Sequence, residues 1–432
     1  MQAVSNTIMV KTTLVPQSHL ELRIMKTSNN VQNIGLIRWL TFLMFTMFAM
    51  TTDAVGVIIP EIIKDFNLSL TQASAFHYAP MIAIAVSGVL FGFLADRLGR
   101  KRTIIIGLGL FACACWLFAV GNQFEVFVLL LALSGCAIGI FKTGALALIG
   151  DISTSSLNHT RTMNTVEGFF GVGAIIGPAV VAYLLASQVS WKYLYIIAGF
   201  ISLLLLLTAA MVAYPSRKVQ SGEPIDLKRT VKMMANPYAL GFSLAIALYV
   251  ATEVAIYVWM PSLLKSYSGS AVWFATYALA IFFVLRASGR FLGAWVLARF
   301  SWTSVMLCFS GAIFLCFLGS TVIGVSAAVF LLPISGLFMS MMYPTLNSKG
   351  ISCFAKHEHG TIAGVILFFT AVAAALGPLL MGAIGDLFGA VEYGFYLATG
   401  FAGLLFAAML FNWLKNPALA RLQEIDASEY TE

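Results

Sequence analysis

Charge is scarce in this chain, since Asp, Glu, Lys and Arg together make up 10% of the 432 residues. A soluble domain carries about 25% of such residues, whereas hydrophobic residues here reach 60%. The sequence contains no glycine-rich loop ending in Lys-Ser/Thr, which argues against ATP-driven pumping. It also contains no nucleophile elbow, so the Ser and His residues at 153–159 do not indicate a hydrolase. The composition predicts a polytopic membrane protein that is not an enzyme.

Metal-ligand spacing and a signal peptide are also lacking. Five of the six cysteines fall in apolar segments and none has the spacing of a metal site. We expect small buried thiols, with no metal and no cofactor. Residues 1–35 are polar and lack an apolar core with a cleavage site, so they predict a disordered cytoplasmic tail. Either Met1 or Met25 could be the start.

Twelve apolar segments are long enough to cross a bilayer, which requires about 20 helical residues. One long polar interruption, 214–237, separates six segments from six. The sequence therefore predicts an all-α membrane protein with bundles at 36–213 and 238–414, a linker at 214–237 and tails at 1–35 and 415–432. The expected spans are 37–60, 72–94, 103–121, 126–149, 163–186, 191–213, 238–262, 270–294, 302–320, 324–347, 361–384 and 391–413.

Lys and Arg are distributed unevenly over the loops. With both termini on one side, 20 of the 25 lie on that side, Arg290 and Arg299 among them, and three lie on the other, while Lys142 and Arg286 fall within the membrane. Positively charged loops stay in the cytoplasm. We therefore expect both termini to be cytoplasmic in an inner or plasma membrane. The positive charge indicates topology rather than nucleic-acid binding, and we expect a monomer in the lipid bilayer.

The two halves repeat with an offset of 200 residues. Gly177-Pro178 recurs as Gly377-Pro378, and Thr52-Asp53 recurs as Thr252-Glu253. A parallel repeat of six helices is one transporter architecture, with substrate bound between the halves near the midplane. Because proline kinks a helix and glycine permits close packing, we expect Gly177, Pro178, Gly377 and Pro378 to be bending points.

The stretch 92–102 concentrates glycine and charge between two apolar segments. It resembles the signature that the major facilitator superfamily carries between helices 2 and 3, which implies that family's twelve-helix fold and secondary transport by alternating access. We expect a cytoplasmic gate in which Asp96 faces a helix N-terminus or a cation of the other half. An equivalent acid is lacking between Gly293 and Arg299, so we expect a one-sided gate. Topology determination by charge alone is the alternative. The expected gate residues are Gly92, Asp96, Arg97, Gly99, Arg100 and Lys101.

The second half is similar to the fucose, glucose and galactose proton symporters. The similarity lies in 289–300 (GRFLGAWVLARF), in Met339-Ser340 with 343–345 (YPT), and in 248–254 (LYVATEV). It implies a small polar solute, with sugar as the first candidate, moved together with protons.

Three positions depart from those symporters. They carry an acid where this chain has Gly56, an acid where it has Lys142, and a glutamine-like residue where it has Glu167. These departures leave open a proton-coupled efflux antiporter, or an importer of organic anions or amino-acid-like solutes that uses Lys142. A non-transporting membrane sensor is the alternative from a different class.

Five ionisable residues lie within the spans: Asp53, Lys142, Glu167, Glu253 and Arg286. Such residues are costly in a membrane and mark pathways or proton relays. At the rise of an α-helix, Asp53 and Glu253 lie ~24 and ~22 Å from the cytoplasmic ends of their helices, and Lys142 and Glu167 ~10 and ~6 Å. We expect Asp53 and Glu253 to carry protons, with a purely structural role as the alternative.

The expected substrate cavity contains Lys142, Glu167 and Arg286, together with Asn164, Tyr257, Trp259, Tyr343 and Asn347. Lys142 and Glu167 form either a substrate contact or a buried ion pair. For Arg286 we expect a side chain that extends toward the cytoplasmic surface, with a ligand or Glu253 as the alternative partner. We expect His77 at the outer membrane interface.

Overall fold

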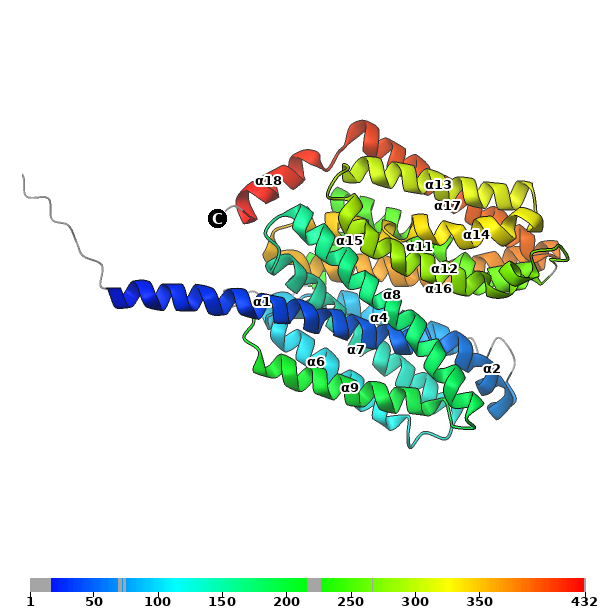
Figure 1. The fold of residues 1–432 in the computed structure, drawn as a ribbon, viewed down its shortest axis with the longest axis horizontal. Coiled ribbons are helices and arrows are strands. Elements are labelled where there is room, and N and C mark those ends of the chain that lie inside the picture. Colours follow the sequence, from blue (N-terminus) through cyan, green and yellow to red (C-terminus); the bar gives the residue numbers. More distant parts are fainter. Residues whose placement is uncertain (1–16, 69–71, 73–74, 216–226, 266, 431–432) are drawn as a thin grey trace, which may run out of the picture.

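The computed structural model describes residues 17–68, 72, 75–215, 227–265 and 267–430. These residues form helices joined by short loops, and the helices are arranged as two bundles. Figure 1 shows the bundle formed by the first half beside the bundle formed by the second half, with the C-terminal helix at the end where the N-terminal segment emerges. We name this end the terminal end, and the other the opposite end.

The first bundle contains six crossings, the first of which is interrupted. α1 ends at Thr52 and α2 begins at Val55, so Asp53 lies in the turn between them. The expected span 37–60 is therefore two helices. The bundle comprises α1 (Gln17–Thr52), α2 (Val55–Phe66), α4 (Ala75–Phe91), α6 (Arg100–Leu117), α7 (Phe124–Asp151), α8 (Ser156–Ala186) and α9 (Lys192–Met211).

The second bundle also has one interrupted crossing. Pro344 has no N–H to donate to the carbonyl of Ser340, four residues earlier, and the chain breaks between α14 and α15 at this point. The bundle comprises α11 (Pro237–Leu264), α12 (Val272–Val296), α13 (Trp302–Val322), α14 (Val325–Met339), α15 (Met342–Ser352), α16 (His359–Phe388) and α17 (Val391–Lys415). Short helices outside the crossings are α5 (Leu94–Arg97), α10 (Leu227–Met234), η1 (Lys356–Glu358) and α18 (Leu419–Glu429).

Ten spans in the described part of the chain are long and apolar enough to cross a membrane. The other two crossings are α4, which is a shorter apolar helix of 17 residues, and α6, which begins with Arg100, Lys101 and Arg102. Together these give the twelve crossings expected from the sequence. The expected disordered tail is wrong for residues 17–35, because α1 already begins at Gln17.

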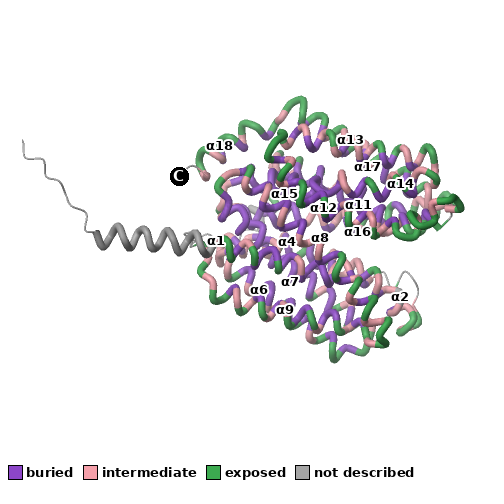
Figure 2. Tube along the Cα trace, viewed as in Figure 1, coloured by how far each residue is buried: buried purple, intermediate pink, exposed green. Residues whose placement is uncertain are grey.

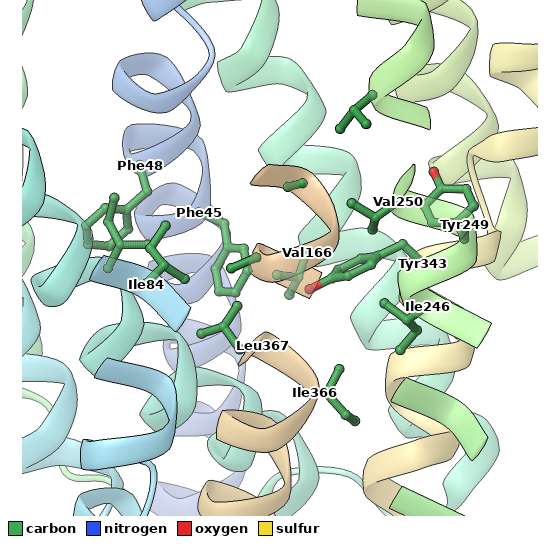
Figure 3. Close-up of a cluster of buried hydrophobic side chains, with 14 of the residues drawn as sticks. Phe45, Phe48, Ile84, Val166, Ile246, Tyr249, Val250, Tyr343, Ile366 and Leu367 are labelled. Atoms are coloured by element: carbon green, nitrogen blue, oxygen red, sulfur yellow. The ribbon is translucent and has the colours of Figure 1, made fainter. Parts of the chain in front are cut away.

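The bundles meet along α4 with α16 and along α8 with α12. Backbones approach closely there, because a Cβ atom at Gly364 would lie 2.1 Å from the carbonyl oxygen of Gly88. Figure 2 shows buried residues concentrated between the bundles and exposed residues on their outer faces. An exposed apolar outer face is the pattern expected where lipid is the surrounding solvent. The close-up in Figure 3 shows buried apolar side chains of both halves, among them Phe45, Val166 and Leu367, near Tyr343.

Candidate functional site

A cavity of about 880 Å³ lies between the two bundles. Helices α1, α2, α4, α7 and α8 line it from the first half, and α11, α12, α15 and α16 line it from the second. The lining continues toward the opposite end, where Gly56 and Thr276 are exposed. Its ionisable lining residues are Asp53, His77, Tyr78, Lys142, Glu167, Glu253, Tyr257, Arg286, Arg290 and Tyr343.

Glu253 and Arg286 form an ion pair across α11 and α12. The Arg286 Nε lies 2.7 Å from the Glu253 Oε1, and both side chains are buried. The Tyr249 hydroxyl donates to the same carboxylate and lies 3.0 Å from the carbonyl oxygen of Met339. The expected extension of Arg286 toward the surface is wrong, because Glu253 gives the guanidinium an anionic partner inside the membrane and a surface contact is no longer needed.

Glu167 is paired with Arg290, so the expectation that Arg290 is one of the cytoplasmic cations is wrong. Arg290 Nη1 donates to the backbone oxygen of Glu167 at 2.8 Å and lies 3.6 Å from its carboxylate. The side chain of Arg290 is fully buried in α12 and lines the cavity. A signal was present in the sequence: Arg290 follows Arg286 by four residues, a spacing that places both on one face of a helix.

Lys142 is not part of an ion pair with any described residue. Its Nζ lies 4.8 Å from the ring centre of Phe170 and 5.9 Å from that of Phe45. The expected alternative of a Lys142–Glu167 pair is therefore wrong in this conformation. Asp53 accepts a hydrogen bond from the Thr52 hydroxyl at 2.9 Å. Asp53 and Lys142 are thus the two cavity charges left without an ionic partner among the described residues.

The neutral residues expected in the cavity divide into two groups. Tyr257 and Tyr343 line it. The expectation is wrong for Trp259, whose indole donates to the carbonyl oxygen of Pro378 at 3.2 Å, and for Asn164, which donates to Thr160 and Thr345. Asn347 is likewise outside the lining and has no exposed surface. His77, expected at the membrane interface, instead lines the cavity.

Asp96 occupies the N-terminus of α16, which belongs to the other half. Its Oδ1 accepts from the Gly360 amide at 3.0 Å, and its Oδ2 accepts from the Thr361 amide at 2.8 Å and the Thr361 hydroxyl at 2.7 Å. A carboxylate is favourable there because the first amides of a helix have no helical partner and carry partial positive charge. Burial raises the pKa of Asp96, while Arg100, the Thr361 hydroxyl and the Gly360 amide oppose the shift.

Arg100 joins this contact to the rest of the terminal end. Its guanidinium lies 2.7 Å from Asp96 and 2.8 Å from Asp151, and it donates to the carbonyl oxygen of Lys356 at 2.6 Å. Lys101 instead donates to two carbonyl oxygens at the C-terminal end of α9, those of Ala210 and of Val212, the residue that follows the helix. We name Asp96, Arg100, Gly360 and Thr361 the first latch.

Three other expected gate residues, Gly92, Arg97 and Gly99, contribute no side-chain contact to the first latch. Gly99 has a φ of +85°, which favours glycine. A Cβ atom at Gly92 would lie 3.2 Å from the carbonyl oxygen of Gly360 in the other half. Arg97 is in no hydrogen bond or ion pair with the described residues, so the expectation that it completes the network is wrong.

A second acid occupies the N-terminus of α8, and the expectation of a one-sided gate is wrong. Asp426 of α18 accepts from the Ser156 amide at 2.9 Å and from its hydroxyl at 2.7 Å. Arg421 in the same helix donates to the carbonyl oxygen of Cys353 at 2.9 Å, which ties α18 to the second half. We name Asp426 and Ser156 the second latch. The loop at 293–299 contains no acid, and the acid of the second latch comes from the C-terminal helix instead.

Between the latches, polar side chains of α8 meet those of α15 across the bundle interface. The His159 Nδ1 lies 2.8 Å from the Ser352 hydroxyl, and the Thr160 and Ser348 hydroxyls lie 2.9 Å apart. The rings of His159 and His359 are stacked with centres 6.0 Å apart. These contacts, with the two latches, close the terminal end.

The expected bending points lie inside continuous helices, Pro178 in α8 and Pro378 in α16. A Cβ atom at Gly177 would lie 2.0 Å from the carbonyl oxygen of Met50, and one at Gly377 would lie 3.2 Å from the Cα of Ala251. Both glycines therefore permit close helix packing, α8 on α1 and α16 on α11. Bending at these positions stays a prediction.

The chain is similar to known proteins over most of its length. Residues 41–378 match the model of the Major Facilitator Superfamily. The quinolone resistance protein NorA of Staphylococcus aureus (strain MRSA252) is 25% identical over 366 residues, which are 80% of this chain and 89% of that protein. The glucose/galactose transporter of Brucella abortus biovar 1 (strain 9-941) is 27% identical over 380 residues, or 84% of this chain and 90% of that protein.

Two solved structures share the fold. The transporter FucP in its outward conformation superposes with a TM-score of 0.74 at 21% identity, covering 88% of this chain and 99% of that one. The proton:xylose symporter XylE bound to 6-bromo-6-deoxy-D-glucose gives 0.71 at 16% identity, covering 92% and 99%. With its twelve crossings and inter-bundle cavity, the protein is a multi-pass membrane transporter that belongs to the Major Facilitator Superfamily.

Proposed function

We propose that this protein carries a small polar solute across the membrane by alternating access, coupled to protons, with a sugar-like molecule as the first candidate. The observation that supports this most is the cavity between the bundles, which contains three carboxylates and three cations and is closed at the terminal end. Burying a charge in the membrane costs free energy, so such charges are kept where they pair with an opposite charge or have a functional role. The similarity to the glucose/galactose transporter of Brucella abortus supports a sugar-like solute.

Proton coupling is assigned to Asp53. Glu253 and Glu167 each form an ion pair, whereas Asp53 forms none among the described residues: its hydrogen-bond partner is the Thr52 hydroxyl, and Arg286, Lys142 and Arg290 are its charged neighbours. A carboxylate that lacks an ionic partner is the one that most easily alternates between charged and neutral forms. Glu253 has the complementary role of holding α11 against α12 through Arg286.

The latches supply the gate. Both place an acid on the N-terminus of a helix at the bundle interface, and both must separate before the cavity can open at the terminal end. We place the terminal end in the cytoplasm, with the protein in the inner or plasma membrane, because the Lys and Arg residues cluster there. The conformation described here then faces outward.

Efflux is the second candidate function. NorA is a similar protein of comparable length, and the cavity also has an apolar part that includes Phe48, Phe170 and Phe283. The same cavity and latches operate in either direction. A counterflow assay that includes a quinolone beside the sugars therefore tests this candidate.

The test uses purified protein in proteoliposomes. We expect Asp53→Asn to abolish proton-driven accumulation and to retain exchange of the solute at equal concentrations, since exchange does not require the proton to leave. Asp65→Asn, which neutralises an exposed acid near the opposite end, is the matched control and should behave like wild type. Unchanged proton-driven accumulation in Asp53→Asn would refute the assignment.

A further inference from the structure

The charges of the cavity identify the class of solute, an inference that rests on the proposed function. Its acids are Asp53, Glu167 and Glu253, and its cations are Lys142, Arg286 and Arg290. Two ion pairs, Glu253–Arg286 and Glu167–Arg290, take up four of these six charges. Asp53 on the α1–α2 turn and Lys142 on α7 are left, and both belong to the first half.

Lys142 is placed to receive an anion from the cavity. Its ammonium group lies against the faces of Phe170 and Phe45, and a lysine held this way keeps its remaining donors for another partner. The charged residues around it are Asp53 on the α1–α2 turn, Glu167 on α8, and Arg286 and Arg290 on α12. Both carboxylates are near enough to interact electrostatically with Lys142, and neither forms an ion pair with it.

Charge balance then restricts what can be carried. With Asp53 ionised and Lys142 charged, the empty cavity is neutral. A proton on Asp53 alone leaves one positive charge, and an anion alone leaves one negative charge. A proton on Asp53 together with an anion on Lys142 restores neutrality. Since an uncompensated charge in a closed membrane cavity is strongly unfavourable, only the empty and the doubly loaded forms change conformation readily.

We propose that the transported solute bears a carboxylate that binds Lys142, and that it moves with one proton held on Asp53. The hydroxyls of Tyr257 and Tyr343 line the same cavity and suit the hydroxyl groups of such a solute. The class is therefore small hydroxy carboxylates of monosaccharide size, such as hexuronates and hexonates. A neutral sugar carried with a proton would leave the loaded cavity with one uncompensated positive charge.

Counterflow in proteoliposomes with wild-type protein tests the class. The probes are D-glucuronate, D-galacturonate and D-gluconate, compared with D-glucose, D-galactose, L-fucose and the quinolone norfloxacin. We expect counterflow of at least one carboxylate. Its proton-driven uptake should be unchanged when a valinomycin–potassium potential is imposed, because one anion and one proton carry no net charge. Counterflow of a neutral sugar without any of the three hydroxy carboxylates overturns this inference while leaving the proposed transport function in place. Norfloxacin is a zwitterion with a carboxylate of its own, so its counterflow without any of the three hydroxy carboxylates overturns the hydroxy carboxylate class and favours efflux. The absence of flux for every probe overturns both.

Variants of Lys142 test the site. Lys142→Gln should raise the KM for the carboxylate at least tenfold, whereas Lys142→Arg, which keeps the charge, should retain most of the affinity. Lys64→Gln removes an exposed lysine at the opposite end and is the matched control. If Lys142→Gln does not fold, Lys142→Met replaces it, and thermal stabilisation of wild-type protein by D-gluconate but not by D-glucose gives a second measurement. An unchanged KM in a folded Lys142→Gln or Lys142→Met, or equal stabilisation by both compounds, overturns the inference.

Discussion

Asp96→Asn should shift the protein toward the form that is open at the terminal end. In the described conformation the Oδ2 of Asp96 accepts two hydrogen bonds from Thr361, and its Oδ1 accepts from Gly360 and Arg100. Asparagine replaces one of these oxygens with an NH₂ group, which would face donors. Hydrogen bonds to a charged group contribute about 1.5–3 kcal/mol each. Loss of two therefore costs about 3 kcal/mol, or roughly a 150-fold change in the conformational equilibrium.

Spin labels report this shift. Thr154 in the first half and Lys415 in the second are exposed and lie near the terminal end, so cysteines there can be labelled without entering the interface. In a background without native cysteines, pulsed electron resonance should show one short distance distribution for the parent protein. A longer population should appear in Asp96→Asn and should dominate when Asp426→Asn is added, because the second variant opens the other latch.

Asp65→Asn is again the matched control, since it removes an exposed carboxylate that lies in neither latch. The uptake rate should fall in the latch variants and stay unchanged in the control. If Asp96→Asn leaves both the distance distribution and the uptake rate as in the parent, the 92–102 stretch fixes topology only and the latch interpretation is refuted.

Two further predictions concern stability and thiol chemistry. Glu253→Gln should lower the melting temperature, because removing one partner of a buried ion pair costs about 3–5 kcal/mol and leaves the Arg286 charge uncompensated. Adding Arg286→Gln should restore much of the lost stability. A Glu253→Gln variant as stable as wild type would contradict the pairing. Burial raises the pKa of the Cys353 thiol to about 12, against the opposing effect of Lys349 and Arg421. In a variant that keeps only Cys353, about one thiol in 10⁴ is ionised at pH 8, so maleimide labelling should be slow and should rise about tenfold per pH unit. Labelling of Cys353 at the rate of a solvent-exposed cysteine would contradict its burial and raised pKa.

Much of the fold was available from the sequence because lipid imposes a simple rule. Each crossing must be a helix of about 20 apolar residues, so the twelve spans could be counted, and charge placement then predicted their orientation. The interruption of the first crossing at Asp53 was not predicted, since an apolar run gives no sign of a two-residue turn. The acid at Asp426 was missed for a related reason: a tail outside the spans has no periodicity that places it beside Ser156.

For the candidate site, most of the charged residues could be predicted from the sequence, but their partners could not. The sequence by itself identified five of the charges that lie in the membrane, because an isolated Asp53, Lys142 or Glu253 stands out in an apolar run, but it did not identify Arg290. Only the tertiary structure decided the partners: Arg286 pairs with Glu253, Arg290 pairs with Glu167, and Lys142 forms no ion pair with a carboxylate in the part of the chain that the structure describes. The physical reason is that depth along a helix follows from residue number, whereas the direction in which a side chain points depends on how each helix is rotated against its neighbours in the bundle.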